Sequence, residues 1–183
     1  MRKALGLFFA TSLLVSVAAI SAAPAGAANT TLPKCKSISG TSTYTPGLPP
    51  TSSKATVKPV NKVTFSITGC TGGGITKGSS SGSLKSTTAT NCSILFKDVG
   101  KPAKPTTGKI TWSNGQTSTT SSVLTVTGVK GTALTAKLVS KYTAGLGKGH
   151  TSTVLVLANP NKGWCSTAPL SKVTFKSTSI TSK

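Results

Sequence analysis

The sequence is almost without acidic residues, since Asp98 is the only aspartate or glutamate among 183 residues. Glycoside hydrolysis needs a pair of carboxyl groups, so that mechanism is excluded. Metal sites built on carboxylates and histidines are also short of ligands, because His150 is the single histidine. We therefore predict that the chain is not an enzyme and that it has no catalytic residues, metal site or cofactor.

Long hydrophobic runs are missing except at the N-terminus. There the start MRK is followed by ALGLFFATSLLVSVAAI and by the small-residue site Ala25–Ala27. This order predicts a secretory signal peptide over residues 1–28 and a secreted or cell-wall-associated chain. A retained membrane anchor is the alternative, disfavoured because no stop-transfer charges follow the run. We expect no transmembrane segment after cleavage, and a single domain over residues 29–183.

Arginine is absent after Arg2. The exported part holds 19 lysines against Asp98, a net charge of +18. Lysine is a flexible point charge, whereas arginine makes the two-pronged contacts that read phosphates and bases. The composition favours diffuse attraction to a polyanion and argues against a specific nucleic-acid partner. The alternative is that the lysines only keep a β-rich surface soluble and protect its edges.

Four cysteines, Cys35, Cys70, Cys92 and Cys165, lie in the exported part. An even number in an oxidising compartment predicts two disulfides, for which three pairings exist. Cys35 opens one strand-like run and Cys70 closes the next, so antiparallel pairing would bring them together. This favours Cys35–Cys70 with Cys92–Cys165. A zinc site is disfavoured because the sequence has no C-x-x-C and its histidine is distant from every cysteine.

Helical periodicity is also missing after the N-terminal run. Short segments rich in Val, Ile and Thr recur between Gly, Pro and Asn, which is typical of all-β proteins. We predict a disulfide-bonded antiparallel β-sandwich of immunoglobulin type with about eight strands. The predicted strands lie near residues 35–44, 63–68, 92–97, 107–113, 117–127, 134–138, 154–157 and 172–181, and the predicted connections near 45–61, 72–82, 100–105 and 144–149. The tetrapeptide KVTF occurs at 62–65 and 172–175, and we interpret it as a chance recurrence because its flanks differ.

The stretch ITWSNGQTST contains Trp112 and the pair Asn114–Gly115. Asn-Gly favours a two-residue type I′ turn, which would place Trp112 opposite Thr117. Strict alternation then puts residues 124 and 126 on the opposite face, so we expect a bulge or a sheet switch near 121–122. A sugar-binding platform would need acidic companions that the chain lacks. We predict that Trp112 belongs to the core.

A G-x-S-x-G motif spans Gly78–Gly82, and the order Ser80, Asp98, His150 matches that of α/β-hydrolases. The motif requires a helix after the serine, and the residues that follow have no helical period. Because Ser and Thr make up nearly a third of the residues, such a match arises readily by chance. A hydrolase that uses Ser80 is the remote alternative.

Several motifs together resemble a group of small exported actinobacterial proteins. They are C-x-x-I-S-G (35–40), PGLP (46–49), F-x-x-x-x-C-x-G-G (65–73), NCS (91–93) and ITWSNG (110–115). The resemblance implies an exported β-sandwich of a Gram-positive envelope and carries no binding or catalytic residues with it.

From these features we predict association with anionic cell-wall polymers or membrane headgroups. The alternative is a binding module for a small apolar ligand or a protein partner, with loops 45–61 and 71–90 as its site. The sequence leaves the oligomeric state open.

Overall fold

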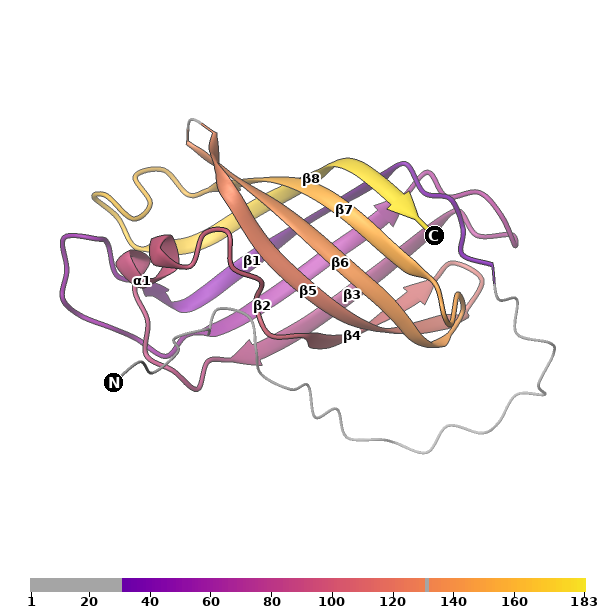
Figure 1. The fold of residues 1–183 in the computed structure, drawn as a ribbon, viewed down its shortest axis with the longest axis horizontal. Coiled ribbons are helices and arrows are strands. Elements are labelled where there is room, and N and C mark those ends of the chain that lie inside the picture. Colours follow the sequence, from indigo (N-terminus) through magenta and orange to yellow (C-terminus); the bar gives the residue numbers. More distant parts are fainter. Residues whose placement is uncertain (1–30, 131) are drawn as a thin grey trace.

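The protein is a closed antiparallel barrel of eight strands, seen in a computed structural model that describes residues 31–130 and 132–183 (Figure 1). The elements are β1 (Ser37–Leu48), β2 (Val60–Thr68), β3 (Lys77–Lys85), α1 (Cys92–Lys97), β4 (Thr106–Trp112), β5 (Thr117–Lys130), β6 (Ala133–Gly145), β7 (Thr151–Pro160) and β8 (Leu170–Ser182). The prediction of an antiparallel all-β fold with eight strands is confirmed. The signal peptide predicted for residues 1–28 lies outside the described residues.

The predicted sandwich is wrong, because β8 pairs with β1 and closes the sheet on itself. The two KVTF segments lie on either side of β1 in the same register. Thr43 is opposite both lysines of these segments, and Gly40 is opposite both Phe65 and Phe175. A Cβ at Gly40 would lie 2.7 Å from an atom of each phenylalanine. Glycine therefore leaves room over β1 for the Phe175 ring and the Phe65 side chain, and the two segments place their phenylalanines on either side of the same residue.

Two apolar clusters close the two ends of the barrel. One consists of Leu32, Ile67, Cys70, Ile75, Ile110, Trp112, Tyr142 and Leu146. The other consists of Leu48, Cys92, Leu95, Leu134, Ala158, Cys165, Leu170 and Val173. The predicted pairing is confirmed, with Cys35–Cys70 at the first end and Cys92–Cys165 at the second. Each disulfide thus ties a connecting segment to the barrel.

Two predicted elements are wrong. Residues 92–97 form the helix α1 and not a strand, because the side chain of Asn91 caps its first turn by accepting a hydrogen bond from the Ile94 amide at 3.1 Å. Residues 77–85, predicted in part as a flexible connection, form β3 along the whole of β2, from Thr68↔Lys77 to Val60↔Lys85. Its serines and glycines carry little strand propensity, so pairing with β2 determines its conformation.

The β4–β5 hairpin differs from the predicted type I′ turn by one residue. The Trp112 amide donates to the Gln116 carbonyl at 2.9 Å, and Gly115 has a φ of 83°. The turn is therefore a longer loop with a glycine bulge, which pairs Ile110 with Ser118. Ser118 and Val126 then lie on the same face as Trp112, so no sheet switch is needed near residues 121–122. Trp112 is 4% exposed, which confirms its place in the core.

We expect Gly115→Ala to lower the free energy of unfolding by about 1–2 kcal/mol, because an L-residue with a side chain disfavours the left-handed conformation that Gly115 adopts. No atom lies near enough to contact an added Cβ, so the loss reports backbone conformation alone. Chemical denaturation measures it. Gly115→Asn is the control and should lose less, since asparagine tolerates this region. Equal losses for the two variants would contradict this explanation.

Candidate functional site

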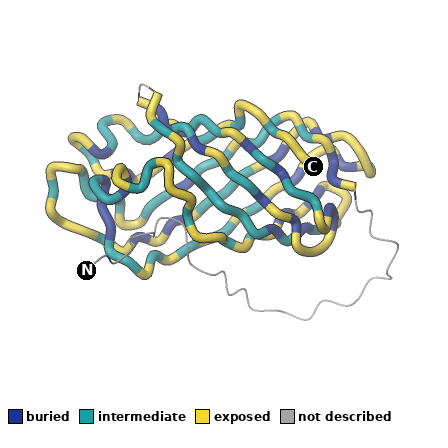
Figure 2. Tube along the Cα trace, viewed as in Figure 1, coloured by how far each residue is buried: buried dark blue, intermediate teal, exposed yellow. Residues whose placement is uncertain are grey.

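Lysine covers the outside of the barrel. All 19 lysines from residue 34 onward are exposed, and those on strands come from β2, β3, β4, β5, β6 and β8. They are Lys34, Lys36, Lys54, Lys58, Lys62, Lys77, Lys85, Lys97, Lys101, Lys104, Lys109, Lys130, Lys137, Lys141, Lys148, Lys162, Lys172, Lys176 and Lys183. Exposed positions recur between buried and intermediate ones along the strands (Figure 2). The alternation of the strands explains this placement, because lysine occupies outward positions and apolar or small residues occupy inward ones. The positive charge is distributed around the molecule.

The single acidic side chain is already paired. Asp98 accepts a hydrogen bond from the Lys101 ammonium at 3.0 Å and follows α1 directly. The Asp98 side chain is 13% exposed and that of Lys101 is 61% exposed. Because the lysine partner remains largely in solvent, the pair contributes little to stability. Its consequence is electrostatic, because no second acidic side chain in the sequence can neutralise the other lysines.

The residues of the hydrolase-like motif do not come together. Ser80 lies on β3 and faces the interior, since it is opposite Phe65. Asp98 lies beside α1, at the end of the barrel that contains Cys92. His150 precedes β7 at the opposite end, and its Nδ1 lies 3.1 Å from the Lys183 carbonyl oxygen. The three residues that match the hydrolase order therefore lie at three separate places in the barrel.

Hydroxyl groups line part of the barrel interior. Ser42 donates to the Asn61 amide oxygen at 2.6 Å, and the hydroxyls of Ser122 and Ser140 are 2.8 Å apart. Burial raises the pKa of Tyr142 above its usual value, an effect reduced by a hydrogen bond with Ser152. The interior therefore disfavours charge but offers hydrogen bonds.

A second interior tyrosine behaves in the same way. Burial raises the pKa of Tyr44, and a hydrogen bond with Ser42 partly offsets the increase. Because Tyr44 and Tyr142 lie toward opposite ends of the barrel, on β1 and β6, the preference for neutral groups extends along the interior.

The two loops predicted as a binding site meet only at the end of the barrel near α1. Residues 45–48 belong to β1, and Val57 pairs with Thr90 near α1. Residues 71–76 lie at the other end, where Ile75 joins the first apolar cluster. β3 runs the length of the barrel between these ends. Residues 86–90 of the second loop therefore lie beside the first loop, and residues 71–76 lie at the opposite end.

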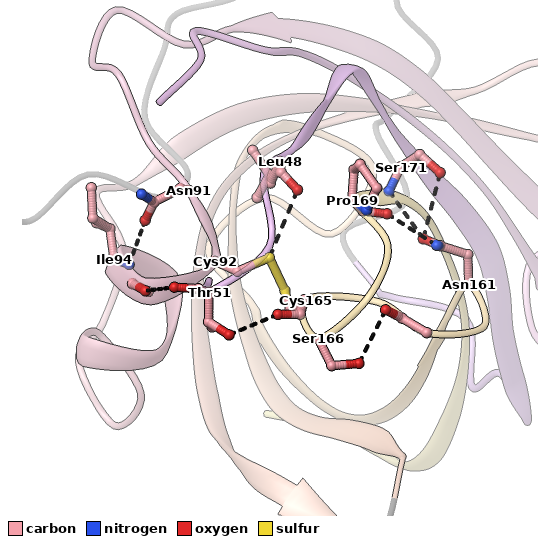
Figure 3. The surroundings of a disulfide bond; sticks show 12 residues. Leu48, Thr51, Asn91, Cys92, Ile94, Asn161, Cys165, Ser166, Pro169 and Ser171 are labelled. Carbon is pink, nitrogen blue, oxygen red and sulfur yellow. Dashed lines mark hydrogen bonds between the residues drawn. A yellow bond between two sulfur atoms is a disulfide. The ribbon is translucent and has the colours of Figure 1, made fainter. Parts of the chain in front are cut away.

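The end near α1 is closed by covalent and hydrogen bonds together (Figure 3). The Cys92 amide donates to the Pro49 carbonyl at 3.0 Å. The amide and the hydroxyl of Thr51 both donate to the Cys165 carbonyl, at 2.8 and 3.0 Å. Asn161 accepts from the Ser171 amide and donates to the Pro169 carbonyl, each at 3.0 Å. These contacts hold the segment around Cys165 across the barrel end.

Within residues 31–130 and 132–183, no helix combines the length and apolar character needed to cross a membrane. In the same ranges, no three His, Cys, Asp or Glu side chains are grouped as metal ligands would be. The two disulfides indicate an oxidising, non-cytoplasmic environment. No protein-family model, curated protein or solved structure matches this chain.

Proposed function

We propose that this protein is an exported, non-enzymatic barrel that associates with anionic polymers of the cell envelope through its lysines. One observation carries the proposal: every lysine from residue 34 onward is exposed, and the only acidic side chain is paired with one of them. A surface of this kind attracts a polyanion over long range and releases the counterions of that polyanion on contact.

The distribution of charge favours polymers over a compact ligand. Lys62 and Lys172 flank β1, whereas Lys137 and Lys141 lie on β6. A flexible chain of phosphates or carboxylates can follow such separated charges, whereas a single small anion meets only a few of them. Membrane headgroups and wall polymers share this chemistry, and comparing them in one assay distinguishes them.

We expect affinity for poly(glycerol phosphate) and for isolated cell walls to fall at least about tenfold between 50 and 200 mM NaCl. The oxidised chain from residue 29 is the protein to use, and sedimentation with wall fragments measures binding. Vesicles of anionic lipid are tested in parallel. Stronger binding to the polymer supports the wall as the source of the anion, and stronger binding to vesicles supports the membrane.

Two matched pairs of variants test whether the attraction is diffuse. Lys62→Gln with Lys172→Gln, and Lys137→Gln with Lys141→Gln, remove equal charge from different walls of the barrel. The proposal expects similar losses of affinity for the two pairs. Retention on cell walls that is indifferent to molar salt, or a loss confined to one pair, would overturn it.

A further inference from the structure

Part of the barrel interior between the two end clusters is incompletely buried. Apolar residues at the two ends are mostly buried, among them Ile67, Leu134 and Leu170. Among the inward-facing apolar residues of the middle, Ala136 and Val154 are buried, and others are only partly buried. They include Val63, Phe65, Leu124, Leu138 and Val156. Side chains in a completely filled interior would all be buried, because its centre is the part farthest from solvent.

Small residues occupy the wall formed by β3, β4 and β5. Between Ile110 and Leu124, the inward positions of this wall are small residues: Ser80, Gly82, Thr106, Gly108, Thr120 and Ser122. An eight-stranded barrel has an interior just wide enough for inward side chains to fill it. Glycine, serine and threonine on one wall leave part of that volume unfilled. This unfilled volume explains why apolar side chains that face the wall are only partly buried.

Gly108 and Gly78 illustrate the difference between the middle and the end. A Cβ at Gly78 would lie 2.7 Å from the ring of Trp112, so Gly78 is packed. A Cβ at Gly108 would meet a single atom within 4 Å, the Thr120 hydroxyl oxygen at 3.3 Å. Gly108 therefore borders space, whereas Gly78 borders a side chain.

The β3–β4 seam is the least paired part of the barrel wall. β3 and β4 pair only at Gly78↔Trp112 and Ser79↔Thr111, whereas β2 and β3 pair along nine residues. From Ser80 to Leu84, β3 faces β4 without ladder pairs. Because apolar clusters and disulfides close both ends, the seam is the side from which a molecule can enter.

We propose that the barrel interior binds a small uncharged molecule, mainly apolar with a hydroxyl or carbonyl group, which enters through the β3–β4 seam. Apolar contacts would come from Leu124, Leu138 and Val156, and hydrogen bonds from the hydroxyls of Ser80 and Ser122. Every lysine from residue 34 onward is exposed, and no inward position in the middle of the barrel carries a charge. An ionic group inside would therefore remain unpaired, which selects neutral ligands.

The neutral dye N-phenyl-1-naphthylamine, whose fluorescence rises in apolar surroundings, tests the proposal with the oxidised protein. We expect saturable binding that changes less than twofold between 50 and 500 mM NaCl. Gly108→Leu fills the interior and should weaken binding at least tenfold. Thr107→Leu adds a similar side chain at the neighbouring outward position and should change binding less than twofold.

Thermal unfolding of the same variants supplies a second readout. If the interior holds space, Gly108→Leu leaves the unfolding midpoint unchanged or raises it, because the added side chain buries apolar surface. If Gly108→Leu fails to fold, Ser80→Leu with the outward control Ser81→Leu replaces it. Absence of saturable dye binding to the wild type, or equal loss in inward and outward variants, would overturn the proposal. These outcomes are independent of polymer binding, since the dye carries no charge.

Discussion

Trp112→Ala is expected to lower the free energy of unfolding by about 3–5 kcal/mol, the usual cost of removing a buried tryptophan. Its ring lies against Gly78 and is 4% exposed. Its Nε1 donates to the Ser118 hydroxyl at 2.8 Å, and Ser118 donates to the Leu146 carbonyl at 2.7 Å. The substitution opens a cavity and breaks this chain of bonds at the end where the β3–β4 ladder begins. Urea denaturation measures the loss.

Trp112→Phe separates the packing of the ring from its hydrogen bond. Phenylalanine keeps much of the apolar contact with Gly78 but leaves the Ser118 oxygen without its donor. We expect a loss of about 1–2 kcal/mol beyond the change in ring size. A loss below about 1 kcal/mol for Trp112→Ala would show that this end of the barrel tolerates a void, contrary to the packing described above.

Replacing Cys92 and Cys165 together with alanine is expected to lower stability by about 4 kcal/mol, because the bond constrains a long loop of the unfolded chain. The two cysteines are 73 residues apart and are 0% and 2% exposed. For a chain of this size the unfolding midpoint should fall by about 10 °C or more. Calorimetry without reductant measures the shift.

The matched control is Cys35→Ala with Cys70→Ala, where the separation is 35 residues. In the chain-entropy model, the shorter loop makes that bond less stabilising by under about 1 kcal/mol. The double variant at Cys92 and Cys165 should therefore be the less stable of the two. Wild-type protein with the same midpoint in the presence and absence of reductant would contradict a stabilising role for either bond, provided that a thiol assay shows both bonds reduced.

Much of the barrel wall could be predicted from the sequence, because strand alternation is a local signal. Val63, Phe65 and Ile67 face inward as their spacing predicts. The disulfide pairing was also predictable, since antiparallel neighbours bring Cys35 next to Cys70. Closure of the sheet into a barrel could not be predicted from strand alternation. The same alternation suits a sandwich and a barrel, and the choice depends on pairing between β1 and β8.

Three misassigned segments share a physical cause, which is that tertiary contacts outweigh local preference. β3 has almost no apolar residues, so the sequence around Ser80 favours a connection. The helix α1 is a short apolar run that looks like a strand, and Asn91 is the signal for its start. The hairpin was predicted one residue out of register because only Gly115, and not Asn114, has a positive φ.

The two candidate sites also differ in how far they could be predicted from the sequence. The lysine surface could be predicted from composition, because lysine is rarely buried. The interior space could not, since it depends on which serines and glycines face inward on β3, β4 and β5. The short pairing of β3 with β4 could not be predicted either, because the alternation of residues along one strand does not show how many of them pair with a neighbouring strand.

Closure of the barrel between its first and last strands has a consequence for biosynthesis. The Ile38 amide donates to the Ser177 hydroxyl across 139 residues, so this junction forms only when nearly the whole chain is present. Until β8 is available, β1 keeps an open edge that can pair with other chains. The period between the emergence of β1 and that of β8 is therefore when the nascent protein is most exposed to aggregation, and a chain truncated before β8 should keep that exposure permanently.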